Sequence, residues 1–221
     1  MNSRPRVKIC CIKSPAEAAL AIAAGASALG LVSAMPSGPG VISEASIASI
    51  AATVPPPIAT FLLTSQHSPS AIIAQQRACR TNTLQLCDHL SPEVYPILRA
   101  ALPGIALVQV VHVSGPESVE YAIAAAAHVD ALLLDSGNLS LPVKQLGGTG
   151  RAHDWSLSRC IRDSISIPIF LAGGLRPDNV AEAIATVQPF GLDLCSGVRT
   201  NDNLDAAKLH AFFAAILSAT V

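Results

Sequence analysis

Short apolar runs alternate along this chain with longer segments that mix small apolar and polar residues. The runs predict strands at residues 7–11, 28–32, 58–63, 83–86, 105–111, 131–135, 169–172 and 191–195. The longer segments predict helices at residues 14–24, 43–52, 69–77, 92–101, 116–127, 156–164, 179–187 and 205–217. Eight strand–helix units in succession predict a closed parallel (β/α)8 barrel, a TIM barrel, forming one domain over residues 1–221. An open flavodoxin-like sheet would leave the last three units unexplained.

The first strand places two reactive side chains on one face. Side chains alternate across a strand, so Lys8 and Cys10 share a face and Val7 and Ile9 share the other. If Val7 and Ile9 pack on helices, Lys8 and Cys10 point into the barrel.

A carboxylate ends the sixth predicted strand, where residues 131–136 read Ala-Leu-Leu-Leu-Asp-Ser. A Gly-rich segment follows, Gly-Gly-Thr-Gly-Arg-Ala-His-Asp-Trp. Because glycine has no side chain, the backbone of such a segment can approach a ligand closely. Asp135, delivered to the carboxyl end of a buried strand beside such a loop, is therefore a candidate catalytic residue. The structural alternative is that Asp135 caps a turn.

Two later segments, 170–179 (FLAGGLRPDN) and 191–198 (GLDLCSGV), end an apolar strand in glycines. In a (β/α)8 barrel the loops after the last two strands commonly bind phosphate through backbone N–H groups and a helix N-terminus. The alternative is that these glycines serve only tight turns.

Composition excludes several classes of function. Aromatic residues are 4% of the chain and the net charge is −1, so we expect no nucleic-acid partner. Residues 18–35 are apolar enough to resemble a membrane span, but Gly25 and Gly30 divide them into helix-like and strand-like halves, and we expect no membrane insertion. The six cysteines show no CxxC spacing, which predicts reduced thiols in a cytoplasmic protein without a metal site.

In combination, LLLDS, GGTGR-x-x-DW, LAGGL-x-PDNV and DLCSGV resemble the phosphoribosylanthranilate isomerases, enzymes of tryptophan biosynthesis that catalyse an Amadori rearrangement. Residues 8–13, KICCIK, resemble that family's opening KICG motif, and the resemblance extends from Val7 to about Phe212. It implies a phosphorylated small-molecule substrate and two proton transfers, which need one acid and one base but no metal or cofactor.

The resemblance also implies roles for individual residues. Asp135 takes the acid role and Cys10 the base role. Strand alternation, and not the resemblance, makes Lys8 the cation that lowers the pKa of Cys10. The residues implied to bind the substrate and its phosphate are Lys8, Gly148, Arg151, Gly173, Gly174, Ser196 and Gly197.

The chain departs from the family pattern on the side expected to hold the anthranilate. The loop at residues 33–40 lacks the family's arginine, residues 85–88 read QLCD instead of QLHG, and Cys11 replaces a glycine. Arg199, which stands where the family has an acidic residue, or Arg176 could supply a substitute cation. Three hypotheses follow: the family's own reaction, an Amadori isomerase for a different ribosylamine 5-phosphate, or a non-catalytic phosphate-binding barrel. The Ala-rich helices allow a monomer or a homodimer.

Overall fold

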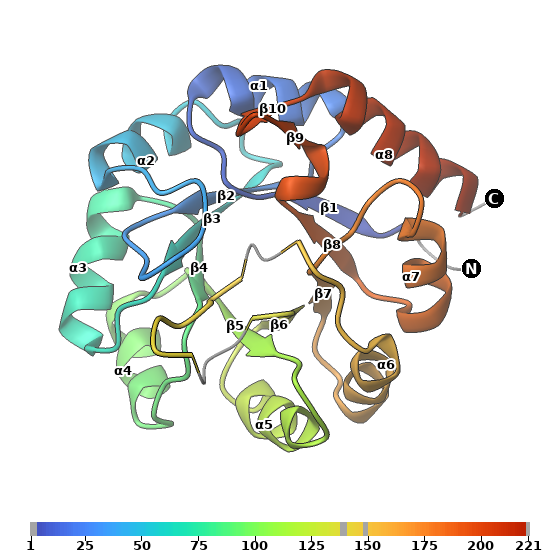
Figure 1. Ribbon diagram of the computed structural model, residues 1–221. Coiled ribbons are helices and arrows are strands. Elements are labelled where there is room, and N and C mark those ends of the chain that lie inside the picture. Colours follow the sequence, from blue (N-terminus) through green and yellow to red (C-terminus); the bar gives the residue numbers. More distant parts are fainter. Residues whose placement is uncertain (1–3, 138–140, 148–149, 220–221) are drawn as a thin grey trace.

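The computed structural model describes residues 4–137, 141–147 and 150–219. Eight parallel strands close into a barrel in sequence order, and an outer ring of helices covers it (Figure 1). The strands are β1 (Arg6–Ile9), β2 (Ala28–Val32), β3 (Ala59–Thr64), β4 (Thr83–Leu86), β5 (Ala106–His112), β6 (Ala131–Asp135), β7 (Ile169–Leu171) and β8 (Gly191–Leu194). The helices are α1 (Pro15–Ala24), α2 (Glu44–Ala51), α3 (Pro69–Cys79), α4 (Val94–Ala101), α5 (Glu117–Ala126), α6 (Trp155–Ser164), α7 (Val180–Val187) and α8 (Ala206–Ala219). The predicted (β/α)8 barrel is confirmed.

Two boundaries differ from the sequence prediction in ways that affect the site. β1 ends at Ile9, so Cys10 lies just beyond the strand at the mouth of the barrel. After β8 the chain forms a short 3-10 helix, η1 (Ser196–Val198), and a small antiparallel pair, β9 (Arg199–Thr200) and β10 (Asn203–Leu204). This pair was not predicted because its strands have only two residues each, too few for a detectable alternation.

The buried apolar residues form two layers on opposite faces of the strands. Val7 and Ile9 belong to the larger layer, which lies between the strands and the helices. Cys10, Phe61 and Phe170 belong to the smaller layer inside the barrel. Lys8 is fully buried, and its ammonium nitrogen lies 5.2 Å from the centre of the Phe61 ring. The predicted orientation of β1, with Lys8 and Cys10 inward, is therefore confirmed.

The start of the chain shows why these segments form helices. The Ser14 hydroxyl accepts a hydrogen bond of 3.2 Å from the Glu17 N–H, Pro15 occupies the first turn of α1, and Gly25 ends it with φ of +113°. Residues 33–40 contain no helix or strand, as their Pro and Gly content predicts. Within the described residues, none of the helices has the length and apolar character needed to cross a membrane.

Candidate active site

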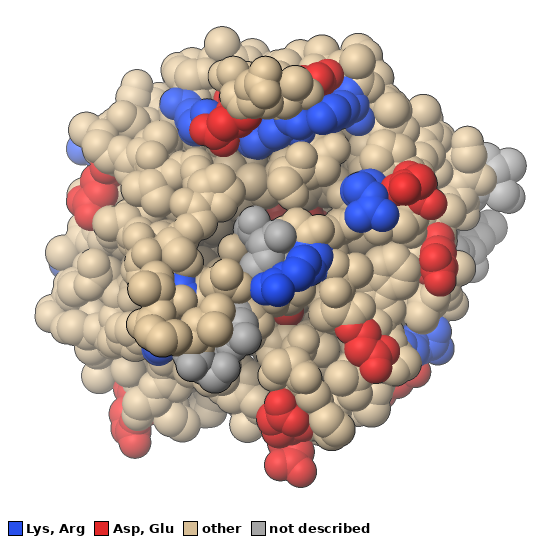
Figure 2. Space-filling view, in the orientation of Figure 1, with Lys and Arg blue, Asp and Glu red and all other residues tan. Residues whose placement is uncertain are grey.

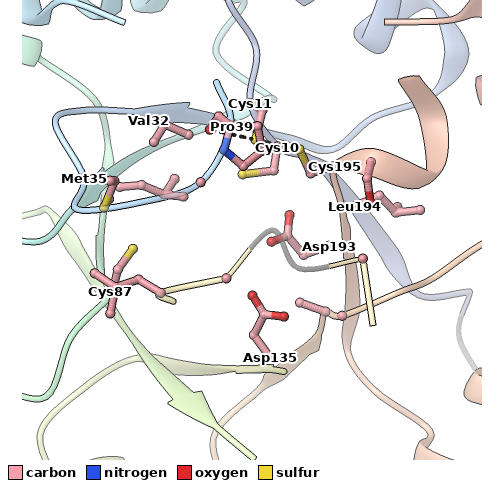
Figure 3. A pocket seen from close by; sticks show the side chains of 18 of the residues that line it. Cys10, Cys11, Val32, Met35, Pro39, Cys87, Asp135, Asp193, Leu194 and Cys195 are labelled. Atoms are coloured by element: carbon pink, nitrogen blue, oxygen red, sulfur yellow. Dashed lines mark hydrogen bonds between the residues drawn. The ribbon is translucent and has the colours of Figure 1, made fainter. Parts of the chain in front are cut away.

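A cavity opens at the carboxyl ends of the barrel strands (Figure 3). Cys10 and Asp135, which the sequence assigns to strand ends, both line it although they are 125 positions apart in the chain. The other polar or sulfur-containing residues of the lining are Cys11, Met35, Ser37, Gln85, Cys87, Asp193, Cys195 and Ser196. Figure 2 views the molecule from the same side and shows mostly uncharged surface, with a basic side chain near the centre and most other charged side chains toward the rim.

Asp135 is the last residue of β6, and its side chain is directed into the cavity (Figure 3). Its carboxylate accepts a 2.7 Å hydrogen bond from the Ser136 N–H. Burial disfavours the charged form and raises the pKa of Asp135 from 3.8 to about 6, against the opposing effect of that hydrogen bond. A minority of Asp135 carboxyl groups, about one in ten at pH 7, therefore keeps the proton, far more than at the ordinary pKa of the group.

The loop after β6 closes tightly over this carboxylate. Gly147 has φ of +126°, and a Cβ atom there would lie 2.4 Å from Asp135 Oδ2. Only glycine combines this backbone conformation with such a close approach. The Gly-rich segment thus serves the predicted purpose of bringing backbone next to the candidate acid.

Cys10 follows β1 directly and is 6% exposed. The neighbouring Cys11 thiol, whose Sγ atom also lies 3.6 Å from the carbonyl oxygen of Pro39, lowers the pKa of Cys10. The positive charge of Lys8 acts in the same direction, against the effect of burial. The sequence predicted the contribution of Lys8 but missed the larger contribution of Cys11. Cys10 is thereby suited to act as a thiolate base.

Lys8 does not have the surroundings of a substrate-binding residue. Its Nζ atom lies 2.9 Å from Asp193 Oδ1 inside the barrel, and Lys8 is absent from the described lining of the cavity. Lys8 was predicted to contact the substrate, but in the structure it lies inside the barrel beneath Cys10. Asp193 itself, which does line the cavity, was overlooked in the sequence. The signal was present: a carboxylate in the apolar run of β8, which pairs with the strand that carries Lys8.

The loops after β7 and β8 meet on one side of the cavity, as predicted. Gly173, Gly174, Ser196 and Gly197 all line it. Gly174 has φ of +63°, and a Cβ atom there would lie 2.6 Å from the backbone nitrogen of Ala152 in the loop after β6. The three loops therefore pack backbone against backbone, which suits the binding of a phosphate through N–H groups.

Two predicted site residues of the loop after β6, Gly148 and Arg151, are not among the described residues that line the cavity. Gly148 lies outside the described residues. Arg151 is exposed, and its guanidinium donates a 2.9 Å hydrogen bond to the Gln145 side chain on the same loop. Arg151 does not belong to the described lining of this cavity, so its contact with substrate stays a prediction.

Asp88, whose role the sequence left open, anchors the loop after β6. Its Oδ2 atom lies 2.6 Å from Lys144 Nζ and 3.0 Å from His67 Nε2. The backbone carbonyl of Lys144 also accepts a 2.7 Å hydrogen bond from the Ser37 hydroxyl. The loop that covers Asp135 is thus attached both to the end of β4 and to the loop after β2.

Neither proposed substitute cation occupies the cavity. Arg199 is 7% exposed, and its guanidinium binds the Glu17 carboxylate at 2.9 Å and the carbonyl of Cys11. Arg176 is exposed and pairs with Asp178 at 3.0 Å. Among the lining residues that the structure describes, the charged side chains are Asp135 and Asp193. The described residues also include no cluster of His, Cys, Asp or Glu that could hold a metal ion.

Comparison with known proteins gives the family. The model of the N-(5′-phosphoribosyl)anthranilate (PRA) isomerase family matches residues 7–215 of this chain. The chain belongs to this family. Among PRA isomerases, the Methanocella arvoryzae protein is 33% identical over 193 residues, covering 87% of this chain and 88% of its own. The Haloarcula marismortui protein is 35% identical over 196 residues, covering 88% and 87%.

Solved PRA isomerases have the same architecture. The Thermus thermophilus enzyme superposes with a TM-score of 0.80 at 28% identity, covering 96% of this chain and 98% of its own. The Thermotoga maritima enzyme superposes with a TM-score of 0.80 at 29% identity, covering 97% of this chain and 99% of its own. A further PRA isomerase, solved with reduced 1-(o-carboxyphenylamino)-1-deoxyribulose 5-phosphate, gives 0.78 at 27% identity, covering 97% and 99%. The predicted family is confirmed.

Proposed function

We propose that this protein converts N-(5′-phosphoribosyl)anthranilate into 1-(2-carboxyphenylamino)-1-deoxyribulose 5-phosphate. The observation that carries the proposal is the pair of oppositely shifted groups on one cavity. The pKa of Asp135 is raised to about 6, while the pKa of Cys10 is lowered. A carboxyl group shifted toward its protonated form and a thiol shifted toward its thiolate form are the two groups that an Amadori rearrangement needs.

The reaction then follows in two proton transfers. Asp135 donates its proton to the ring oxygen of the ribose, and the ring opens to a Schiff base between C1 and the anthranilate nitrogen. The Cys10 thiolate removes the proton from C2, and the electron pair neutralises the iminium as an enolamine. The enolamine then tautomerises to the ketone. Lys8 stays beneath Cys10 and favours its thiolate form.

The substrate phosphate belongs on the side of Gly173, Gly174, Ser196 and Gly197. These residues follow β7 and β8, and they bring backbone to the cavity with little side chain in the way. A phosphate bound there leaves the sugar near Cys10 and Asp135, which line the same cavity.

A coupled fluorescence assay tests the proposal: the substrate is generated in situ and its disappearance is followed. We expect turnover by the wild type and at least a 100-fold loss, the usual contribution of an acid or base, in Cys10→Ser and in Asp135→Asn. The matched controls Cys160→Ser and Asp163→Asn change an exposed thiol and an exposed carboxylate on α6 and should turn over normally. Unchanged activity in Cys10→Ser or Asp135→Asn would contradict the assigned roles.

One observation favours a second candidate, an Amadori isomerase for a ribosylamine 5-phosphate without a carboxylate on its aglycone. The described lining of the cavity contains no cation to pair with the anthranilate carboxylate. Competition between anthranilate-bearing and carboxylate-free ribosylamine phosphates distinguishes the two candidates by their kcat/KM values. Turnover of either substrate argues against the third hypothesis, a phosphate-binding barrel without catalysis.

We further propose that the enzyme works in the cytoplasm as a monomer or a homodimer. All six cysteines are free thiols, which fits a reducing compartment. A relative from Thermotoga maritima is described as a dimeric phosphoribosylanthranilate isomerase. Analytical ultracentrifugation of this protein measures whether it is a monomer or a homodimer.

A further inference from the structure

Two thiols other than the candidate base meet at the cavity. Cys11, beyond the end of β1, and Cys195, directly after β8, have their sulfur atoms 2.7 Å apart. Both side chains lie in the same corner of the cavity as Cys10 in Figure 3. The contact between these two sulfur atoms is not itself a step of the two proton transfers.

The backbone around these thiols supports a covalent link between them. β1 and β8 are paired neighbours with Ile9 opposite Leu194, so the chain segments that carry Cys11 and Cys195 leave adjacent strand ends. A disulfide requires sulfur atoms about 2 Å apart, so the two thiols need to approach by less than about 1 Å.

We infer that Cys11 and Cys195 form a redox modification site, which a low-molecular-weight disulfide such as oxidised glutathione converts into an intramolecular disulfide. Cys195, the more exposed of the two, attacks one sulfur of the reagent and releases the first thiol. Cys11 then attacks the sulfur of Cys195 and releases the second. Two protein thiols lose two electrons and two protons, and the reagent is reduced to two thiols.

Oxidation at this site would act on the neighbouring base. The neighbouring Cys11 thiol is the largest of the effects that lower the pKa of Cys10. In the disulfide this thiol group is gone, so the Cys10 thiolate becomes harder to form. Cys195 also precedes Ser196 and Gly197, so the link fixes the loop on the proposed phosphate side. The disulfide itself stands independently of the proposed function, whereas its effect on turnover rests on it.

Peptide mapping tests the site directly. The full-length protein is incubated with oxidised glutathione, its remaining thiols are alkylated, and it is digested with trypsin. Peptide 9–13 carries Cys10 and Cys11, and peptide 163–199 carries Cys195 as its one cysteine. We expect these two peptides to be joined, two thiols to be lost per chain, and an excess of dithiothreitol to separate the peptides again.

Two variants identify the bonded sulfur atoms. Cys10→Ser leaves Cys11 as the one thiol of peptide 9–13 and should retain the cross-link, whereas Cys195→Ser should abolish it. Cys160→Ser removes the exposed thiol of α6 and should retain the cross-link and the basal activity. Loss of the cross-link in Cys10→Ser, or its absence from the wild type, overturns the inference.

Turnover provides the second readout. In the wild type we expect oxidation to lower activity at neutral pH about tenfold, the effect of one pKa unit at the base, and reduction to restore it. Full activity of a protein shown by mapping to be oxidised would overturn the coupling to Cys10 but leave the modification site intact.

Discussion

Lys8 on β1 and Asp193 on β8 face each other across the seam that closes the barrel, with Nζ 2.9 Å from Oδ1. Their side chains are 0% and 9% exposed. Burial works to lower the pKa of Lys8, but the charge of Asp193 and of the other acidic neighbours outweighs burial and raises it. Lys8 therefore remains a cation inside the barrel, where it acts on Cys10.

The first prediction concerns this buried ion pair. Lys8→Met should lower the free energy of unfolding by about 3–5 kcal/mol, because Asp193 is left as an uncompensated buried charge. The double variant Lys8→Met, Asp193→Leu should be more stable than Lys8→Met alone. Lys13→Met, which breaks the more exposed pair with Asp202, should cost at most about 1 kcal/mol. Denaturant titration measures the free energy of unfolding of all three variants. Equal losses of this free energy in Lys8→Met and Lys13→Met would refute the argument.

The second prediction concerns the pH dependence of stability at Asp135. Its pKa rises from 3.8 to about 6 on folding, so the folded state binds the proton more tightly. The stability that this group contributes is fully present below about pH 4 and is lost as the pH rises through about 6. Asp135→Asn should therefore be more stable than the wild type above pH 7 by about 3 kcal/mol, the equivalent of the shift, while losing activity.

The comparison for Asp135→Asn is urea unfolding at a series of pH values. The gain should vanish below pH 4, where the wild-type carboxyl is protonated in both states. Asp163→Asn is the control, because the pKa of that exposed carboxyl is lowered by hydrogen bonds from Arg159 and Arg162. It should show no gain at high pH. A gain in Asp135→Asn that is independent of pH would rule out the titration as its cause.

The third prediction concerns Cys11, a non-glycine residue with φ of +63°. Cys11→Gly relieves this left-handed conformation but adds backbone freedom to the unfolded chain, so stability should change by less than about 1 kcal/mol. It also removes the thiol that contributes most to lowering the pKa of Cys10, so this pKa should rise. Cys11→Ser keeps a donor and should lie nearer the wild type. The rate of Cys10 alkylation as a function of pH measures the shift; identical profiles for all three proteins would contradict it.

The fourth prediction concerns the attachment of the loop after β6. Lys144→Met removes one partner of Asp88, whose side chain is 4% exposed but keeps the His89 N–H and His67 as partners, so the loss of stability should be smaller than in Lys8→Met. The loop carries Gly147 over Asp135, so we expect a several-fold increase in KM. Steady-state kinetics measure KM, and Arg159→Met, which breaks an exposed ion pair on α6, is the control. This control distinguishes an effect of the loop from the effect of losing a positive charge. An unchanged KM would show that the Ser37 contact suffices.

The sequence predicted the parts of the site that depend on local pattern. A parallel strand buried on both faces must be apolar along its length, so each barrel strand was visible as a run. The place of Asp135 at a strand end, and of Gly173 and Gly174 after the next strand, followed from that pattern. The alternation of Val7, Lys8, Ile9 and Cys10 predicted the inward face correctly.

The contacts that set the chemistry were not visible in the same way. Lys8 and Asp193 are 185 positions apart, and Cys11 and Cys195 are 184 apart. Each pair meets only because β8 closes the barrel against β1 in one register, and that register depends on the packing of all eight strands. Arg199 was expected as a possible substrate contact, but the hairpin after β8 turns it onto Glu17.

The sequence by itself therefore determined the barrel, the family, and which strand ends carry the candidate acid, base and phosphate loops. The reason is that periodicity, glycine content and motif spacing are local properties of the chain. Only the tertiary structure decided the burial that raises the pKa of Asp135, the Cys11 thiol that lowers that of Cys10, and the contact between Cys11 and Cys195. Desolvation and long-range pairing exist only once the strands have closed around a common interior.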